Sequence, residues 1–279
     1  MPVQISSVRN PRIKALRALR LRKVRHQERR FLVEGIRIVE EALDLGAPVE
    51  TLVYAPDLLV SDRARGLVER AAGVERLEVS AEVLNSLSDR EQSQGLAAVV
   101  RIEDRPLAAI HADERLLAVV AYQLQDPGNL GSIVRTADAA GASALVVVGP
   151  SADLYDPQAV RATMGSLFAL PIAWLDDPEA LLPWFQGLRT EGLPLLVVAT
   201  SAHGREMHYD VGYCRPLVLL VGSERHGLPA GVREAADVDV RLPMAGRATS
   251  LNVSAATAAL LYEILRQRLS CPPGEPATP

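Results

Sequence analysis

LLAVVAYQLQDPGNLGSIVRTADAA, residues 116–140, is the stretch that decides the fold. Seven apolar residues are followed by a loop rich in Gly and Pro, and then by a segment with helical spacing. An apolar run this short suits a strand buried on both faces, because a membrane span needs about 18 residues. The stretch therefore predicts a strand over 116–122 and a helix over 130–140, the unit from which parallel α/β sheets are built.

The same alternation continues on both sides of this stretch. Toward the C-terminus, strands are expected over 144–148, 171–174, 195–199, 217–221 and 238–242, and helices over 157–168, 178–188 and 253–269. Toward the N-terminus, helices are expected over 11–27, 36–45, 62–72 and 81–87, and strands over 31–33, 51–54, 76–79 and 96–102. The predicted fold class is α/β, with a small α/β sandwich followed by a mostly parallel-sheet domain.

A length of 279 residues accommodates two domains, each with its own core. The mixed-charge stretch EDRPLAAIHADER, residues 103–115, marks the boundary between them. We therefore expect a first domain over 1–104, a linker over 105–115 and a second domain over 116–270. Residues 271–279 end in PPGEPATP, whose composition predicts a disordered tail.

The net charge of −4 conceals an uneven distribution of charges. Residues 1–30 contain ten Lys or Arg and one acid, a net charge of +9 that leaves −13 for the remainder. A basic segment on an acidic body indicates a polyanionic partner such as RNA or DNA, although an Arg-rich transit peptide or a solvated helix fits the same residues. No apolar signal-peptide core follows Met1, and Cys214 and Cys271 lack a C-x-x-C partner, which favours a reducing, intracellular compartment.

Three loops rich in Gly and Pro follow strands of the second half. They read QDPGNLG over 125–131, GSERHGLP over 222–229 and PMAGRATSLNVS over 243–254. Taken singly, their Asn, Ser and Gly residues fit helix caps and turns. Ligands of parallel sheets bind beyond the carboxyl ends of the strands, and glycines allow close approach of the main chain. The convergence of three such loops therefore predicts a ligand site.

The common nucleotide-binding and hydrolytic patterns are missing. Neither G-x-G-x-x-G nor G-x-x-x-x-G-K-[ST] occurs, and the five histidines match no metal-ligand spacing. No nucleophile and base stand together in the local sequence. The loops therefore suit a partly apolar cofactor that is not held by its phosphates, and no metal.

Beyond these arguments, the sequence resembles a known family. The segments DPGNLGSIVRTADAAGA, LLVGSERHGLP and LPMAGRATSLNVSAATAALLYE are similar to the three motifs of the SpoU/TrmH family of RNA 2′-O-ribose methyltransferases, in the SPOUT superfamily. FLVEGIRIVEEAL resembles the substrate-binding domain of that family, which is of the ribosomal-protein L30e-like type. The resemblance implies a C-terminal trefoil knot in the second domain, S-adenosylmethionine as the cofactor and a cytoplasmic homodimer.

The resemblance also implies roles for particular residues. Positions linked to catalysis are Asn129, Arg135, Glu224, Ser250 and Asn252. Positions near the cofactor are Thr200, Ser201, Ala202, Gly222, Leu242, Met244, Leu251 and Ser254. Candidates for RNA binding are Arg9, Arg12, Lys14, Arg17, Arg29, Arg30 and Arg161. The second motif departs from many relatives by carrying Arg225 and His226 after the Glu, residues that reach RNA, a partner subunit or solvent.

These features together predict 2′-O-methylation of a ribose in RNA from S-adenosylmethionine. Large-subunit rRNA is favoured over tRNA because the resemblance includes a substrate-binding domain typical of rRNA enzymes. The alternatives are a tRNA 2′-O-methyltransferase, a catalytically silent RNA-binding dimer, a base methyltransferase of the same superfamily and a nucleotide-binding oxidoreductase. The missing glycine fingerprint disfavours the oxidoreductase. Neither a membrane nor a metal is expected as a partner.

Overall fold

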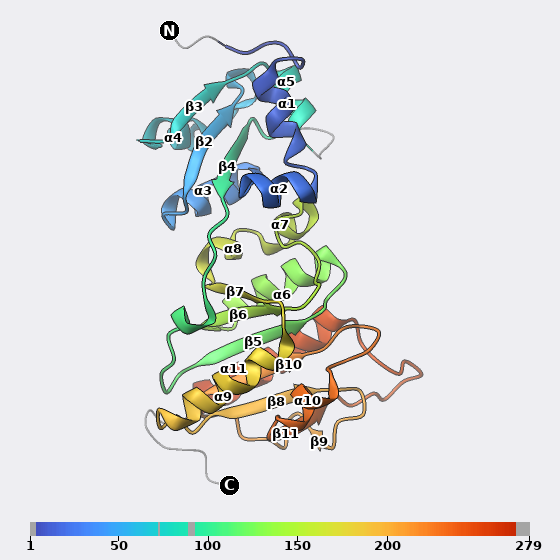
Figure 1. The fold of residues 1–279 in the computed structure, drawn as a ribbon. Helices are drawn as coiled ribbons and strands as arrows, with labels where there is room; N and C mark the ends of the chain where they lie inside the picture. The colour runs from blue at the N-terminus through green and yellow to red at the C-terminus, as the bar shows by residue number, and fades with distance from the viewer. Residues whose placement is uncertain (1–3, 72, 89–92, 272–279) are drawn as a thin grey trace. The chain divides into compact units, whose positions relative to one another are not determined.

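The computed structural model describes residues 4–71, 73–88 and 93–271, so most of the tail expected at 271–279 lies outside the described residues. The chain divides into two compact units (Figure 1). Unit 1 comprises Met1–Glu103 and Asp153–Ala169, and unit 2 comprises Asp104–Ala152 and Leu170–Pro279. Within the described ranges, no helix is long and apolar enough to cross a lipid bilayer.

Unit 1 is built on a four-stranded sheet of order β1-β4-β2-β3. The strands are β1 (Arg30–Glu34), β2 (Val49–Tyr54), β3 (Glu75–Glu78) and β4 (Leu96–Arg101). Its helices are α1 (Pro11–Ala18), α2 (Arg22–Glu28), α3 (Ile36–Asp44), α4 (Asp62–Arg70), α5 (Ala81–Leu87), α7 (Pro157–Thr163) and α8 (Ser166–Ala169), with the short η1 (Pro56–Leu58). Because β4 pairs with β1 and β2 and is buried, it lies at the centre of this small sandwich.

The single helix predicted over 11–27 is wrong, since α1 and α2 are separated at residues 19–21. The guanidinium of Arg25 donates to the carbonyl oxygens of Leu19 at 2.9 Å and Arg20 at 2.6 Å. These bonds satisfy the carbonyl groups at the end of α1, so the helix ends there and Leu21 becomes extended. The helix predicted over 157–168 is likewise interrupted, because Met164 and Gly165 have left-handed φ angles of 52° and 105°.

The segment Asp153–Ala169 belongs to unit 1, although it lies between two strands of unit 2 in the sequence. The Arg25 guanidinium donates to the Asp153 carboxylate at 2.6 Å, and the ring of Phe31 lies 4.8 Å from that of Tyr155. The stretch predicted as a linker over 105–115 is part of unit 2, where Ile110 is buried in the core. The predicted division had a single boundary, at a linker. The observed division has further boundaries, because a buried ion pair and aromatic contacts hold a segment from the second half of the sequence in unit 1.

Unit 2 contains a seven-stranded sheet of order β7-β6-β5-β10-β8-β11-β9, and every pairing in it is parallel. Its strands are β5 (Leu117–Tyr122), β6 (Ala144–Val148), β7 (Ile172–Leu175), β8 (Leu196–Thr200), β9 (Glu206–Met207), β10 (Leu217–Val221) and β11 (Val238–Arg241). The six strands predicted from apolar runs are confirmed within a residue or two. The two-residue strand β9 was not predicted, because it is too short to show a period.

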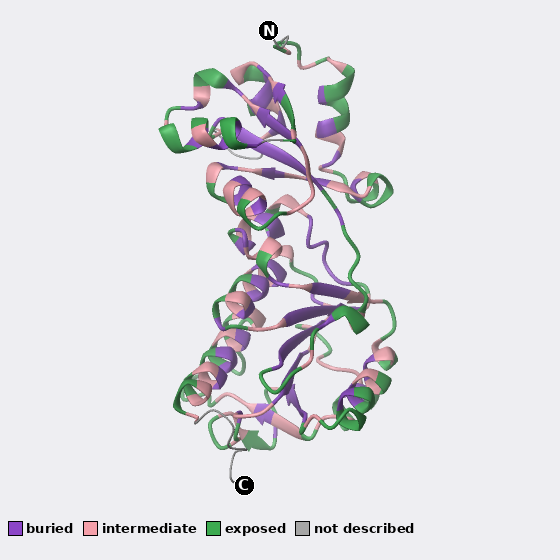
Figure 2. Ribbon diagram, turned by 90° about the vertical axis from the view of Figure 1, so that its left-hand side faces the viewer, coloured by how far each residue is buried: buried purple, intermediate pink, exposed green. Residues whose placement is uncertain are grey.

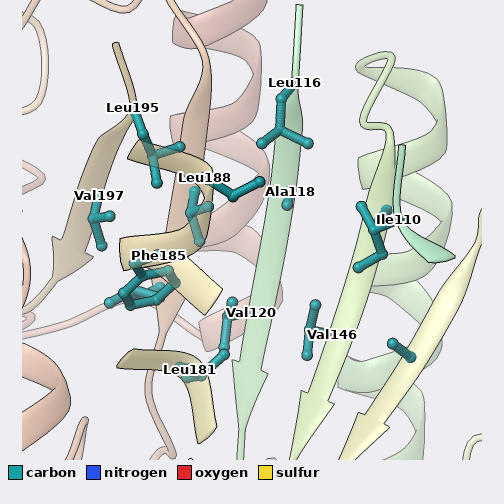
Figure 3. Packing of buried hydrophobic residues seen from close by; sticks show 14 of the residues in the cluster. Ile110, Leu116, Ala118, Val120, Val146, Leu181, Phe185, Leu188, Leu195 and Val197 are labelled. Atoms are coloured by element: carbon teal, nitrogen blue, oxygen red, sulfur yellow. The ribbon is translucent and has the colours of Figure 1, made fainter. Parts of the chain in front are cut away.

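Helices cover both faces of this sheet. They are α6 (Pro127–Ala139), α9 (Leu181–Thr190), α10 (Ala230–Glu234) and α11 (Val253–Ser270), with η2 (Leu107–Ala109) and η3 (Pro178–Ala180). Figure 3 shows Leu181, Phe185 and Leu188 of α9 packed over β5, while α11 packs against α6 on the other face. The central strands are buried on both faces (Figure 2), which explains why their sequences are continuously apolar.

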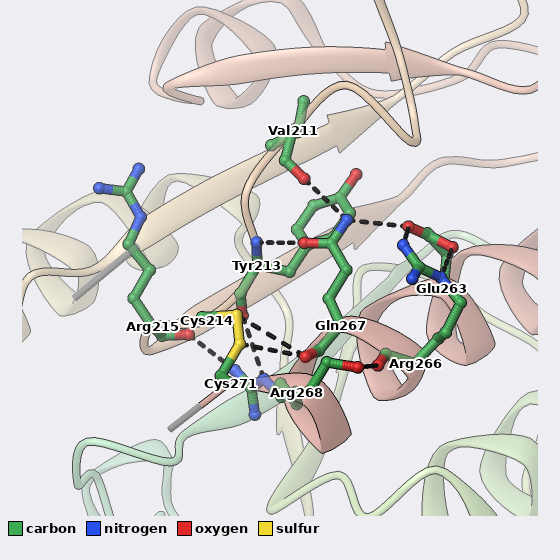
Figure 4. The surroundings of a disulfide bond; sticks show 10 residues. Val211, Tyr213, Cys214, Arg215, Glu263, Arg266, Gln267, Arg268 and Cys271 are labelled. Atoms are coloured by element: carbon green, nitrogen blue, oxygen red, sulfur yellow. Dashed lines mark hydrogen bonds and ion pairs between the residues drawn. A yellow bond between two sulfur atoms is a disulfide. The ribbon is translucent and has the colours of Figure 1, made fainter. Parts of the chain in front are cut away.

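The C-terminal end of α11 is held against the segment before β10 (Figure 4). The Gln267 side chain accepts from the amide of Tyr213 and donates to the carbonyl of Val211, both at 3.0 Å. Cys214 and Cys271 form a disulfide with a Cα–Cα distance of 6.2 Å. The sequence analysis considered only C-x-x-C spacing, and local spacing could not reveal a contact between cysteines 57 residues apart.

Candidate functional site

Asn129 joins the three predicted loops. Its side-chain Nδ2 donates to Oε1 of Glu224 at 3.1 Å, and its Oδ1 accepts from Nδ2 of Asn252 at 3.0 Å. Glu224 follows β10, and Asn252 precedes α11. Three segments that are up to 123 residues apart in sequence thus meet at one amide side chain.

The local sequence explains why Asn129 is free for this contact. Asp126 is the N-cap of α6 and accepts from the backbone amide of Asn129 at 2.7 Å, and Pro127 occupies the first position of the helix. Asn129 is therefore not a cap, and its side chain is available for long-range bonds. Sequence reasoning did not single out Asp126, although Asp followed by Pro at a helix start signals this cap.

Asn252 is both a cap and a member of the site. Its Oδ1 accepts from the backbone amides of Ser254 at 2.9 Å and Ala255 at 3.4 Å, and from the Ser254 hydroxyl at 2.7 Å. The same hydroxyl lies 3.5 Å from Oδ1 of Asn129. Because Oδ1 of Asn252 is occupied by donors of its own helix, its Nδ2 faces Asn129. We name Asn129, Glu224, Asn252 and Ser254 the amide cluster.

The turn after β10 projects Glu224 from the sheet. Ser223 and Gly227 exchange backbone hydrogen bonds of 3.2 and 3.0 Å, so residues 224–226 form the exposed tip. Gly222 is required at its base, because a Cβ there would lie 2.6 Å from the backbone nitrogen of Leu228. In the amide cluster, Asn129 donates to one carboxylate oxygen of Glu224, and the other receives no hydrogen bond from any described residue.

The residues expected near a cofactor lie at the carboxyl ends of β8, β10 and β11. The Thr200 hydroxyl donates to the carbonyl of Leu220 at 2.9 Å, and the Ser201 amide donates to the carbonyl of Val240 at 3.0 Å. Met244 and Leu251 are exposed by 37% and 47%, which is unusual for such apolar side chains. Between residues 243 and 251 the backbone makes no hydrogen bond to other backbone groups of the described chain.

Two of the predicted catalytic residues, Arg135 and Ser250, are not part of the amide cluster. Arg135 is exposed on α6 and Ser250 is exposed in the loop before α11. Neither side chain makes a hydrogen bond or ion pair with a described residue. Ala202 is exposed as well, at the turn that follows Ser201.

The predicted RNA-binding residues are divided between free and engaged side chains. Arg9 and Lys14 are exposed, and neither side chain contacts a partner in the described part of unit 1. Arg17 donates to the hydroxyl of Ser86 at 2.8 Å, and Arg30 forms an ion pair with Glu28 at 2.7 Å. The other engaged residues are Arg12, which pairs with Glu75, Arg29, which donates to Ile102, and Arg161, which lines a small cavity in unit 1.

Much of the basic segment is therefore structural, because composition cannot distinguish a free cation from one that holds the fold. Arg25, counted in the +9 of residues 1–30, is buried. Among the described residues, no three His, Cys, Asp or Glu side chains are placed to hold a metal ion.

Comparison with known proteins assigns both halves of the sequence to described families. Residues 116–262 match the SpoU rRNA Methylase family, and residues 10–98 match the MRM3-like substrate binding domain. The chain is 39% identical over 241 residues to the 23S rRNA (uridine(2479)-2′-O)-methyltransferase of Streptomyces viridochromogenes, covering 86% of this chain and 84% of the relative. It is 31% identical over 261 residues to the 23S rRNA (guanosine(2553)-2′-O)-methyltransferase RlmP of Bacillus subtilis, covering 94% and 98%.

Solved structures give the same result. The SpoU methyltransferase AviRb from Streptomyces viridochromogenes, in complex with AdoMet, matches with a TM-score of 0.86 and 37% identity over 94% of this chain and all of that chain. The AdoMet-bound rRNA methyltransferase from Sinorhizobium meliloti matches with a TM-score of 0.84 and 38% identity over 95% and 97%.

Proposed function

The chain belongs to the SpoU rRNA methylase family, and from this membership we propose that it transfers a methyl group from S-adenosylmethionine to a ribose 2′-hydroxyl of large-subunit rRNA. The observation that carries the proposal is the amide cluster, which joins the three motif loops at the carboxyl edge of the parallel sheet. Ribose in RNA carries the 2′-hydroxyl that the reaction needs, whereas DNA has none.

The loops at this edge fit S-adenosylmethionine. Unpaired backbone groups over 243–251 can bind the polar edge of an adenine, and the exposed Met244 and Leu251 can cover its faces. When bound, the cofactor supplies a methyl group on a sulfonium, an excellent leaving group. The residues that we propose to hold it are Thr200, Ser201, Ala202, Gly222, Leu242, Met244, Leu251 and Ser254.

The chain's own contribution is to align the hydroxyl with the methyl group and to remove its proton. Alignment alone supplies roughly 7–11 kcal/mol in well-oriented reactions. We assign the exposed guanidinium of Arg135 to the phosphate beside the target ribose, since it has no partner among the described residues. Ser250 lies two residues before Asn252 in the same loop, and its exposed hydroxyl is likewise without a partner among the described residues.

Glu224 is the proton acceptor in this proposal. Amides and hydroxyls are poor bases, and arginine stays protonated, so the carboxylate of Glu224 is the one base in the amide cluster. Nδ2 of Asn129 donates to one carboxylate oxygen of Glu224 at 3.1 Å and holds the carboxylate in place. The other oxygen is free to face a substrate. Asn129 thus aims the base.

The choice of large-subunit rRNA over tRNA rests on the relatives and on unit 1. Both relatives described above are named as 23S rRNA 2′-O-methyltransferases, and the chain covers 84% and 98% of their lengths. Residues 10–98 match a substrate-binding domain, which supports a substrate larger than a single nucleotide. The intact amide cluster opposes a catalytically silent RNA-binding protein.

Three further features are proposed from family membership. We infer a homodimer, a trefoil knot formed by the last loops and α11, and a location in the cytoplasm, where ribosomes are assembled. Analytical ultracentrifugation tests the first of these directly. A single species with the mass of one chain, about 30.1 kDa, at micromolar concentration contradicts the dimer.

A methyl-transfer assay tests the proposal. Purified full-length protein with radiolabelled S-adenosylmethionine receives large-subunit rRNA, small-subunit rRNA or tRNA, and the products are digested to nucleosides. We expect label in a 2′-O-methylnucleoside of the large-subunit rRNA alone, lost in Arg135→Ala. A matched control is Arg266→Ala, which removes an exposed arginine paired with Glu263.

Other results overturn parts of the proposal. Label on a base rejects the reaction type, and label confined to tRNA rejects the substrate. Bound S-adenosylmethionine without transfer to any RNA, including RNA in assembling ribosomal particles, establishes a silent binder. Failure to bind the cofactor rejects the whole proposal.

A further inference from the structure

Unit 2 is acidic overall, and all of its basic residues apart from histidines are arginines. Its sequence contains 12 Arg, no Lys and 17 Asp or Glu, a net charge of −5. An acidic body repels a polyanion, so an enzyme that brings RNA to this unit needs local cations at the site. The question is which arginines are free to act in this way.

Several arginines outside the loops of the site are occupied by the fold. Arg189 forms an ion pair with Asp237 at 2.7 Å, Arg233 pairs with Asp239, and Arg266 pairs with Glu263 at 2.7 Å. Arg268 is half-buried and donates to the carbonyls of Arg215 at 2.7 Å and Leu116 at 2.9 Å. Burial lowers the pKa of the Arg268 guanidinium. Its hydrogen bonds hold the end of α11 in place.

Arginines on the loops of the site have no such partners. Arg205, Arg225 and Arg247 are exposed, and in the described part of the chain none of these side chains forms a hydrogen bond or ion pair. They follow β8, β10 and β11 respectively. Because β8 lies between β10 and β11 and all three strands are parallel, the three loops emerge from one edge of the sheet.

Two of these arginines lie within five residues of a member of the amide cluster along the chain. Arg225 directly follows Glu224 at the tip of the turn that Ser223 and Gly227 close. Arg247 lies five residues before Asn252, in the segment whose backbone is otherwise unpaired. A free guanidinium offers a planar set of donors that matches a phosphate, so these positions suit the RNA backbone next to the reacting nucleotide.

We propose that Arg225 and Arg247 bind phosphates of the RNA on either side of the target nucleotide, with Arg205 extending the same surface. This inference rests on the proposed function, because it takes RNA as the substrate. It adds residues of unit 2 to the RNA-binding candidates of the basic segment in unit 1. Contacts of this kind position the strand and carry no sequence information, so base recognition resides elsewhere.

The test compares Arg225→Ala, Arg247→Ala and the double variant with the wild-type protein and with Arg266→Ala. Binding of large-subunit rRNA to the fluorescently labelled protein is measured by anisotropy at several salt concentrations. KM, kcat and the dissociation constant of S-adenosylmethionine are measured alongside. We expect each substitution to weaken RNA binding about 10-fold and the salt dependence, d log K/d log [salt], to fall in magnitude by about one. The values for Arg266→Ala and for cofactor binding are expected to match wild type.

Several outcomes reject the proposal. Unchanged RNA affinity and salt slope in the double variant show that these arginines face solvent. A loss of cofactor affinity at constant RNA affinity shows that they stabilise the cofactor loops instead. Weakened binding to ribosomal particles with unchanged binding to naked RNA identifies an acidic protein surface as the partner. The anisotropy needs no methyl transfer, so a wild-type protein that binds RNA without methylating it rejects the proposed function and leaves this inference standing.

Discussion

Removing the carboxylate of Asp153 is expected to destabilise unit 1 by about 3–5 kcal/mol, the usual cost of leaving one partner of a buried ion pair uncompensated. The side chains of Arg25 and Asp153 are only 1% and 4% exposed. Two donors of Arg25, at 3.0 and 2.6 Å from Asp153, would lose their acceptor in Asp153→Ala. Its bonds to the carbonyls of Leu19 and Arg20 after α1, and its longer contact of 3.5 Å with Asp156, would keep the charge in place and prevent it from reaching solvent.

The matched control is Asp156→Ala. The Asp156 carboxylate lies 3.5 Å from the same guanidinium but is 34% exposed, and it also caps α7, so its loss is expected to cost about 1–2 kcal/mol. The double variant Arg25→Met and Asp153→Leu replaces the buried ion pair by two apolar side chains. It is expected to lower the free energy of unfolding by less than Asp153→Ala does. The comparison separates the price of a stranded charge from the net value of the ion pair.

Hydrogen exchange of the full-length protein provides the assay. Both tryptophans, Trp174 and Trp184, lie in unit 2, so their fluorescence does not report on unit 1. Amides of β1 and β4 are expected to exchange at least 100-fold faster in Asp153→Ala, since 1.4 kcal/mol corresponds to a factor of ten. Equal exchange in Asp153→Ala and Asp156→Ala would refute the reasoning, because it would mean that burial adds nothing to this contact.

Three further predictions follow from the site and from α11. Glu224→Gln keeps an oxygen for the bond from Asn129 but removes the base, so we expect kcat to fall about 100-fold with an unchanged melting temperature, and a fall below fivefold would exclude Glu224 as the proton acceptor. Hydrogen bonds from Arg266 lower the pKa of Glu263 to about 2 from a usual value of 4.5. The contribution of Glu263 to the free energy of unfolding is therefore complete above pH 4.5 and is lost as the pH falls toward 2. In Glu263→Gln this pH-dependent loss of stability should be absent, and identical acid-unfolding curves for the variant and wild type would contradict the prediction. Cys214→Ser opens the loop closed with Cys271, so unfolding in urea should show a loss of about 4 kcal/mol relative to the oxidised protein, whereas wild type under reducing agent should match the variant.

Two kinds of feature could be predicted from the sequence. Apolar runs such as 117–122 and 217–221 have a local cause, because a strand buried on both faces has no polar side to show. The loops after these strands could also be located, since Gly and Pro punctuate the chain wherever it leaves the sheet. Their convergence followed from a general rule, that the carboxyl ends of parallel strands share one edge.

Features decided by contacts between distant residues were beyond prediction. Nothing local in Arg25 distinguishes it from the free Lys14, yet its side chain is buried against a carboxylate 128 residues away and donates to the carbonyl groups that follow α1. The same holds for the segment Asp153–Ala169, which the sequence places within the second half and side-chain packing places in unit 1.

The candidate site likewise has features that were predictable from the sequence and features that were not. The loops of the candidate site and the residue types that they offer could be located from the sequence alone, because loop composition and the spacing of strands are local properties. Only the tertiary structure decided that Asn129 is a bridge and not a cap, and that Arg225 and Arg247 stay free while Arg17 and Arg30 are engaged. The physical reason is that a hydrogen bond or ion pair depends on where two segments meet in space, and a short window of sequence contains only one of them.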